Sequence, residues 1–292
     1  MAGSALLERV TRGDHVCWIV EDEVSRLDTL AGVVLAGLRA RDRVVYCGED
    51  PEGLVAGVGH RGVPAAEAVA SGNLRVSAAE GSLLCSGVFE PAAALSFLRE
   101  EEARARKDKY SGLRVITDMS WASRSLPGAD QVTRYEAGLN SFFSEGYLLG
   151  ICAYDRRLFD PLSLRRHAGA HPSAAGPGMP FDPGSTLRMR RTRHPYGLRL
   201  EGEADMFNRQ ALSSVIARLV DDLPDDGTVI HVDVSGLRFA DTAAARILSQ
   251  AGDRAGGRLR LMGCSPALLR LLDFHGSRLG RDRNGDAERD TA

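Results

Sequence analysis

Residues 16–47 read VCWIVEDEVSRLDTLAGVVLAGLRARDRVVYC, and this stretch decides the fold of the first half of the chain. The continuous apolar runs at residues 16–20 and 44–47 are typical of strands that are buried on both faces. Between them, apolar residues recur every three or four positions, which predicts a helix with one buried face. A strand, a helix and a strand in this order form a βαβ unit, so the sequence predicts a parallel sheet.

The same alternation continues to residue 171. Apolar runs at residues 74–76, 113–117 and 148–154 predict three more strands, and a helix is expected to begin at Pro91. Because the strands are continuously apolar and helices separate them, the sheet should be mostly parallel with helices on both faces. The sequence therefore predicts an α/β domain over residues 1–171.

Length and composition divide the rest of the chain. With 292 residues, of which 43% are apolar, the protein can bury two independent cores. Residues 172–184 are rich in Pro, Gly and Ala, which predicts a linker. Residues 281–292 are charged and lack apolar anchors, which predicts a disordered tail. A second domain is expected between them, over residues 185–280.

This second domain has a different order of elements. A hairpin is expected around HPYG at residues 194–197, followed by a helix. A strand at residues 228–234 and a helix that begins near Asp241 come next. A strand at residues 258–262 then leads to a last helix, capped by Ser265. The pattern predicts a smaller α/β domain.

Charge and cysteine content exclude several classes of protein. The formal net charge is -2, which gives no electrostatic reason to expect a nucleic acid or an anionic membrane as a partner. No apolar stretch approaches the roughly 20 residues that span a bilayer, so a cytoplasmic location is predicted. The five cysteines are widely separated and form no CxxC pair, which favours reduced thiols over disulfides or a zinc ribbon.

Two pairs of residues could each offer two metal ligands. His15 and Cys17 are two positions apart on a predicted strand, and His167 and His171 are four apart on a possible helix. No third ligand is evident for either pair, so the sequence predicts no metal and no other cofactor. For His15, a hydrogen bond that supports the fold is favoured over ligand binding.

Three motifs of the second domain carry a family resemblance: LRLEGEAD at 198–205, HVDVSGLRFADTAAARIL at 231–248 and LRLMGCSPALLRLLDFHG at 259–276. They resemble the STAS domains of bacterial anti-sigma factor antagonists. The resemblance implies a module that binds an anti-sigma factor or a related protein. It places the binding surface at Asp205, Ser235, Asp241, Thr242 and Ala243.

The serine that is phosphorylated in that family is absent from this chain. The resemblance places it at Ala243, which has no hydroxyl group and cannot be phosphorylated. Thr242 precedes it and could accept a phosphate, or could simply hydrogen-bond its own backbone, which is the favoured interpretation. Asp241 is expected to cap the helix.

Four motifs of the first domain carry a second resemblance: GDHVCWIVEDE at 13–23, YSGLRVITDMSWASRSLPG at 110–128, YEAGLN at 135–140 and ICAYDRRLFDP at 151–161. They resemble the MEDS family of sensory domains. The resemblance implies a RecA-like sheet related to ATPases, and a role in sensing a small hydrocarbon derivative or a related ligand.

The residues themselves test the implied relation to ATPases. A nucleotide site in such a sheet needs glycines and a lysine between the first strand and the next helix. Here that loop holds Glu21, Asp22 and Glu23, which would repel phosphate. We therefore expect no ATP hydrolysis and assign no catalytic residue.

A ligand could still bind where the parallel strands end. These ends carry Glu49, Asp118, Trp121, Tyr154 and Asp155, which are our candidate ligand-binding residues. The two aromatic rings could line a partly apolar pocket. Alternatively, Trp121 fills the core, and Asp155 forms a structural ion pair with a neighbouring arginine.

These observations lead to one main hypothesis and two alternatives. The main hypothesis is a bacterial signalling protein without enzymatic activity, in which the first domain senses a small molecule or protein and the second binds an anti-sigma factor to regulate transcription. The first alternative is a degenerate RecA-like nucleotide-binding protein that uses Asp118 with a divalent metal. The second is a scaffold in which neither domain binds a ligand.

Overall fold

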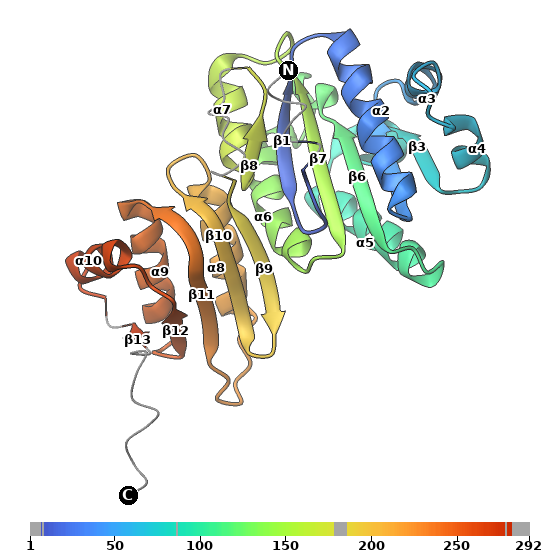
Figure 1. Ribbon diagram of the computed structural model, residues 1–292. Coiled ribbons are helices and arrows are strands. Elements are labelled where there is room, and N and C mark those ends of the chain that lie inside the picture. Colours follow the sequence, from blue (N-terminus) through green and yellow to red (C-terminus); the bar gives the residue numbers. More distant parts are fainter. Residues whose placement is uncertain (1–6, 8, 86, 178–185, 278, 282–292) are drawn as a thin grey trace, which may run out of the picture.

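The described part of the protein contains two large sheets, each with its own helices, and a two-stranded sheet formed by β4 Leu84–Cys85 and β5 Val88–Phe89 (Figure 1). The computed structural model describes residues 7, 9–85, 87–177, 186–277 and 279–281. The α/β prediction is confirmed: a six-stranded parallel sheet is followed by a smaller mixed sheet. Most of the predicted linker, residues 178–184, lies outside the described residues, as do residues 282–292 of the predicted tail.

The first sheet has the strand order β3-β2-β6-β7-β1-β8, and every neighbouring pair is parallel. The βαβ unit predicted from residues 16–47 therefore exists, although β6 and β7 lie between its two strands. The strands are β1 His15–Val20, β2 Asp42–Gly48, β3 Leu74–Ala78, β6 Gly112–Asp118, β7 Leu148–Asp155 and β8 Ser173–Ala175.

Helices cover both faces of this sheet, as predicted (Figure 1). Alternate residues of each strand face opposite cores, so that Trp18 packs on one face and Cys17 on the other. The first face is covered by α2 Glu23–Arg39, α3 Pro51–Gly59 and α4 Ala65–Ala70. The second face is covered by α5 Pro91–Lys107, α6 Val132–Ser144 and α7 Pro161–Gly169.

The second sheet has the order β13-β12-β11-β10-β9. The predicted hairpin is confirmed, because β9 Arg188–Arg193 pairs antiparallel with β10 Tyr196–Ala204. The other pairs are parallel and involve β11 Ile230–Ala240, β12 Leu259–Met262 and β13 Gly280–Arg281. The helices are α8 Arg209–Asp221, α9 Thr242–Arg254 and α10 Pro266–Phe274.

One predicted boundary in this sheet is wrong. The strand expected to end at residue 234 continues to Ala240, because β11 keeps pairing with β10 through two shifts in register. Because of these two shifts, the strands stay paired past Gly202 of β10 and Gly236 of β11, beyond the predicted end of the strand. The start of α9 is consequently held directly at the end of a strand, which gives its first turn a defined position.

The two α/β units contact each other. Helix α8 packs against α6, and β9 also contacts α6 (Figure 1). The Arg190 Nη2 atom lies 2.7 Å from Asp14 Oδ1, and Arg191 Nε lies 3.6 Å from Glu145 Oε1. Within the described part of the chain, no helix is long and apolar enough to cross a membrane.

Candidate functional site

Three of the candidate ligand-binding acids lie on neighbouring strands of the first sheet. Glu49 follows β2, and Asp118 and Asp155 end β6 and β7. Each already has a polar partner within the chain. Arg124 Nη2 lies 2.9 Å from Glu49 Oε1, while Arg157 Nη2 lies 2.5 Å from Asp155 Oδ2. Asp118 accepts hydrogen bonds from the amide of Ser120 at 3.0 Å and from its hydroxyl at 2.6 Å.

The pKa values of two acids of this edge are shifted in opposite directions. Hydrogen bonds from Arg157 lower the pKa of Asp155, which keeps that carboxylate charged. Burial raises the pKa of Glu49, and the charge of Arg124 only partly opposes this effect. The interpretation of Asp155 as part of a structural ion pair is confirmed by its contact with Arg157.

The loop after β1 carries the expected carboxylates at the start of α2. Asp22 caps this helix by accepting a hydrogen bond from the Ser25 amide at 2.9 Å. Glu23 forms an ion pair with Arg26 at 2.7 Å. The helix N-terminus, which holds phosphate in nucleotide-binding sheets, is therefore occupied by side chains of the chain itself.

The two aromatic candidates do not join the acids. Trp121 and Tyr154 are buried in the core between the sheet and helices α5 to α7. The Trp121 ring packs against Phe89 with centroids 5.0 Å apart. The Tyr154 hydroxyl donates a hydrogen bond to Glu136 Oε2 at 2.5 Å. The structure thus separates the predicted ligand set into an acidic edge and a buried aromatic pair.

A small internal cavity lies beside this buried pair. Its volume is about 20 Å³, and about 10–15 Å³ is enough for a water molecule. The polar atoms of two lining residues, Trp121 Nε1 and Tyr135 Oη, have no hydrogen-bond partner among the described residues. Most of the lining is apolar, but the remaining polar side chains are His15, Glu136, Cys152 and Thr117. The cavity therefore combines an apolar wall with polar groups and has room for about one water molecule.

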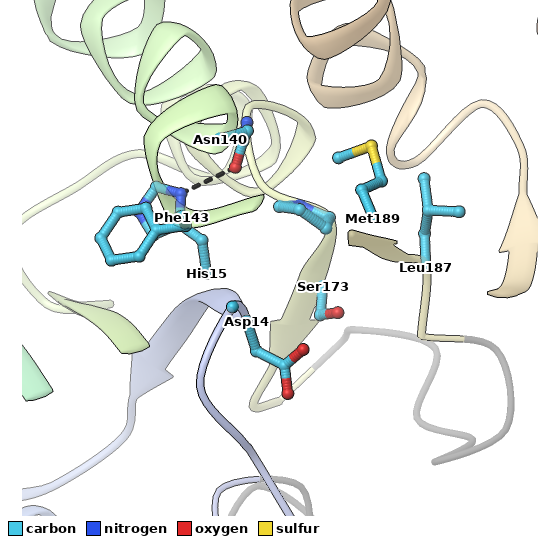
Figure 2. A pocket seen from close by; sticks show the side chains of 9 residues that line it. Asp14, His15, Asn140, Phe143, Ser173, Leu187 and Met189 are labelled. Carbon is cyan, nitrogen blue, oxygen red and sulfur yellow. Dashed lines mark hydrogen bonds between the residues drawn. The ribbon is translucent and has the colours of Figure 1, made fainter. Parts of the chain in front are cut away.

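A cluster of buried polar side chains adjoins the cavity. The sequence did not predict that these residues lie together. His15 Nδ1 lies 2.8 Å from Asn140 Oδ1, and His15 Nε2 lies 3.3 Å from Cys152 Sγ. Figure 2 shows His15 and Asn140 joined by this bond beside Phe143. The predicted fold-supporting hydrogen bond of His15 is thereby confirmed. The His171 ring lies 4.2 Å from that of His15 between centroids.

Burial controls the protonation of these groups. Desolvation lowers the pKa of His15 to about 3, which makes its imidazole neutral at pH 7. Burial also lowers the pKa of His171. For Glu136, burial alone would favour the neutral acid, but His171, His167 and Tyr154 outweigh it and lower the pKa to about 2.

A local signal could have revealed this cluster. Glu136 and Asn140 are four residues apart, so they share one face of α6, and both are buried with the apolar side chains of that face. Polar residues on the apolar face of an amphipathic helix need buried partners. Those partners lie on β1, β7 and the segment after α7, which no sequence spacing connects.

The second candidate site lies at the carboxyl end of the smaller sheet. Asp241 caps α9 as predicted, by accepting a hydrogen bond from the Ala244 amide at 2.8 Å. Its own amide donates to the Ala204 carbonyl at 3.0 Å, which ties the start of α9 to the end of β10. Thr242 is exposed and Ala243 is half-buried in the first turn.

The other predicted partner-binding residues shape neighbouring loops. Asp205 accepts a hydrogen bond from the Phe207 amide at 2.8 Å and so orders the turn before α8. Ser235 is exposed within β11, and its hydroxyl donates to Asp233 at 2.6 Å. Because β10 and β11 are parallel, Asp205 and Asp241 lie at the same end of the sheet.

Exposed apolar side chains surround this end of the sheet. Met206 and Phe207 in the turn before α8 are 65% and 52% exposed, and Phe239 near the end of β11 is 51% exposed. Phe274 at the end of α10 is 80% exposed. His275 Nε2 lies 3.1 Å from the Thr242 carbonyl oxygen, which holds the end of α10 beside the start of α9. We call these four side chains the apolar loop cluster.

Comparison with known families agrees with both parts of the fold. The family described as "MEDS: MEthanogen/methylotroph, DcmR Sensory domain" matches residues 14–172, which is more than half of the chain. The chain belongs to the MEDS family. A second family, described as "Mlab, STAS domain", matches residues 187–277. No curated protein matches the sequence.

The MEDS and STAS domains expected from the motifs are thus confirmed, whereas the anti-sigma factor antagonist type of the STAS domain stays a prediction, and the pair of domains indicates a signalling or regulatory role. The buried cluster and its cavity lie in the MEDS domain, whereas the apolar loop cluster lies in the STAS domain. The domain boundaries assigned from composition stay predictions.

Proposed function

We propose that this MEDS–STAS protein is a bacterial cytoplasmic regulator without enzymatic activity, whose STAS domain binds an anti-sigma factor and thereby regulates transcription. The observation that supports this proposal best is the apolar loop cluster around the start of α9. Several large apolar side chains exposed together at one end of a sheet are typical of sites that bind another protein. Aromatic residues are also enriched among those that dominate binding energy.

The first domain would regulate this surface in place of phosphorylation. Ala243 has no hydroxyl group at the position where the resemblance places the phosphorylated serine. The end of α7 adjoins the turn that carries Met206 and Phe207, because a Cβ atom added at Gly169 would lie 3.7 Å from the Phe207 carbonyl oxygen. A shift of α7 caused by ligand binding would therefore reach the partner-binding turn directly.

The experiment measures binding of the full chain to each anti-sigma factor encoded by its host. We expect one of them to bind, and Phe207→Ser or Phe239→Ser to weaken binding about tenfold or more, since an aromatic anchor contributes more than about 1 kcal/mol. Val24→Ser is the matched control. Val24 is 65% exposed but lies on α2 of the MEDS domain.

Two results would contradict the proposal. The first is that no anti-sigma factor of the host binds. The second is that both phenylalanine variants bind as tightly as the unmodified chain. Thermal unfolding of each variant should be unchanged, because an exposed side chain contributes little to folding stability.

We also propose that the chain does not hydrolyse nucleoside triphosphates. It is supported by the carboxylates of Glu21, Asp22 and Glu23, which occupy the loop where phosphate would have to bind. Calorimetry with ATP and GTP in the presence of Mg²⁺ should therefore show no tight binding. Mg²⁺-dependent binding with release of phosphate would favour the nucleotide-binding alternative instead.

A further inference from the structure

The buried polar cluster of the MEDS domain brings together three metal-ligating side chains from separate elements. They are His15 on β1, Cys152 on β7 and His171 after α7, and their ligand atoms all lie within 4.8 Å of one another. All three side chains are buried. The parallel pairing of β1 with β7 brings the first two together, because it places Cys17 opposite Cys152 and so His15 close to it.

Asn140 fixes which nitrogen of His15 carries the hydrogen. The Asn140 side-chain amide donates to the carbonyl oxygens of Ala137 at 3.0 Å and Ala170 at 2.7 Å, so its Oδ1 atom is the one that faces His15. An oxygen can only accept, so His15 Nδ1 must be the donor. His15 Nε2 therefore presents a lone pair toward Cys152 Sγ, 3.3 Å away.

The same reasoning applies to His171. Its Nδ1 atom lies 2.8 Å from the His167 carbonyl oxygen and must donate to it. The Nε2 atom is buried and has no hydrogen-bond partner among the described residues, and neither has Glu136 Oε1. These two atoms lie 3.6 Å apart.

Three electron-pair donors thus converge, two imidazole nitrogens and a thiol sulfur, and the Glu136 Oε1 atom lies 3.6 Å from one of them, His171 Nε2. Nothing in the described part of the chain supplies hydrogens to His171 Nε2 and Glu136 Oε1, although burying unpaired acceptors is costly. Bond lengths of about 2.0–2.1 Å to nitrogen and about 2.3 Å to sulfur place neighbouring ligands of a tetrahedral zinc ion roughly 3.3–3.6 Å apart. The 3.3 Å between His15 Nε2 and Cys152 Sγ and the 3.6 Å between His171 Nε2 and Glu136 Oε1 match this spacing, and the ligand atoms of His15, Cys152 and His171 lie within 4.8 Å of one another.

The surrounding hydrogen bonds also fit a metal site. Histidine ligands of metals characteristically donate their other ring nitrogen to an oxygen acceptor, and ligating carboxylates are themselves hydrogen-bonded. His15 donates to Asn140, His171 donates to the His167 carbonyl, and Glu136 Oε2 accepts from Tyr154. A carboxylate and a thiolate would together balance the charge of a divalent ion.

We propose that His15, Cys152 and His171, with Glu136 as the fourth ligand, form a Zn²⁺ site in the MEDS domain. Cys152 loses its thiol proton to solvent when the ion binds. The site adjoins the internal cavity, whose lining includes His15, Glu136 and Cys152. Figure 2 places His15 and Asn140 close to Leu187 and Met189 of the STAS domain, so the site lies near the contact between the domains.

The experiment uses the full chain, stripped with a chelator and then titrated with Zn²⁺ or Co²⁺. We expect one ion per chain. Cobalt should produce the strong visible absorption of a tetrahedral site and a thiolate-to-cobalt charge-transfer band in the near ultraviolet. Cys152→Ser should abolish this band, and Asn140→Ala should weaken Zn²⁺ binding about 10- to 100-fold by releasing the His15 ring.

Cys47→Ser is the matched control, because Cys47 is a buried cysteine in the same core but is not among the clustered ligands. It should retain the charge-transfer band and the stoichiometry of one. Circular dichroism of each variant without metal checks folding, and the unmodified chain tests the proposal even if a variant fails to fold.

Three outcomes would overturn the proposal. They are no tight binding of either ion by the unmodified chain, a cobalt spectrum without a thiolate band, and a band that persists in Cys152→Ser. With any of these, the cluster would instead be a set of buried polar side chains without a metal ion. The anti-sigma binding assay is independent, so its result distinguishes failure of this site from failure of the proposed function.

Discussion

At the scale of single residues, the hydroxyl of Tyr154 holds the buried carboxylate of Glu136. It is the donor to Glu136 Oε2, at 2.5 Å, and both side chains are almost completely buried. Tyr154→Phe should therefore lower the free energy of unfolding by about 1.5–3 kcal/mol, the range for a hydrogen bond to a charged group. Urea denaturation in the presence of a chelator measures this loss without a contribution from bound metal.

Tyr46→Phe provides the control for this prediction. Tyr46 is as deeply buried, but its hydroxyl lies 3.4 Å from Asp118 Oδ2, at the long limit of a hydrogen bond. Its removal should cost less than about 1 kcal/mol. Equal losses for the two variants would contradict a special role of the Tyr154 hydroxyl.

Asp241 contributes both to the stability of α9 and to the proposed binding surface. Asp241→Ala removes the hydrogen bond to the Ala244 amide and should lower the free energy of unfolding by about 1 kcal/mol. Asp241→Asn keeps a capping oxygen and should retain most of that stability. If the asparagine variant is as unstable in urea as the alanine variant, capping is not the role of this residue.

At the scale of elements, two glycines of the chain should respond oppositely to alanine. Gly138 lies on the exposed side of α6, and no atom lies within 4 Å of an added Cβ. Gly138→Ala should raise the free energy of unfolding by about 0.5–1 kcal/mol, because alanine loses less entropy in a helix than glycine. Thermal unfolding measures the gain.

Gly197 instead allows β10 and β11 to approach each other. It pairs with His231, and an added Cβ would lie 1.8 Å from the His231 carbonyl oxygen. A methyl group cannot occupy that space unless the strands separate, so Gly197→Ala should destabilise the STAS domain severely. A variant that unfolds in urea like the unmodified chain would show that this close approach is not required.

At the scale of the whole molecule, Arg190 joins the two domains. Its Nη2 atom lies 2.7 Å from Asp14 Oδ1, and Asp14 is only 5% exposed. Arg190→Ala leaves that carboxylate without its nearest arginine, which should weaken the contact between domains and separate their thermal transitions in calorimetry.

Arg193→Ala is the control for this contact. Its side chain is 87% exposed and reaches Glu145 at only 4.0 Å, so stability should change by less than about 0.5 kcal/mol. If Arg190→Ala melts in the same way as this control, the ion pair does not couple the domains.

The sequence determined the local features of this protein because they depend on neighbours in the chain. The apolar runs and helical periodicity predicted the βαβ unit, and the cap at Asp241 followed from residues three positions apart. The motifs also identified both families, since each motif is a continuous segment. The acids at the start of α2 likewise predict that phosphate does not bind there, and this stays a prediction.

Only the tertiary structure decided which side chains meet. Trp121 follows β6 and Tyr154 is the penultimate residue of β7, but both side chains face the core under helices α5 to α7, because packing above the strands decides which side chains are covered. His15, Cys152 and His171 are brought together by strand pairing and by the return of the chain after α7. Long-range packing creates such a cluster, and no spacing between residues encodes it.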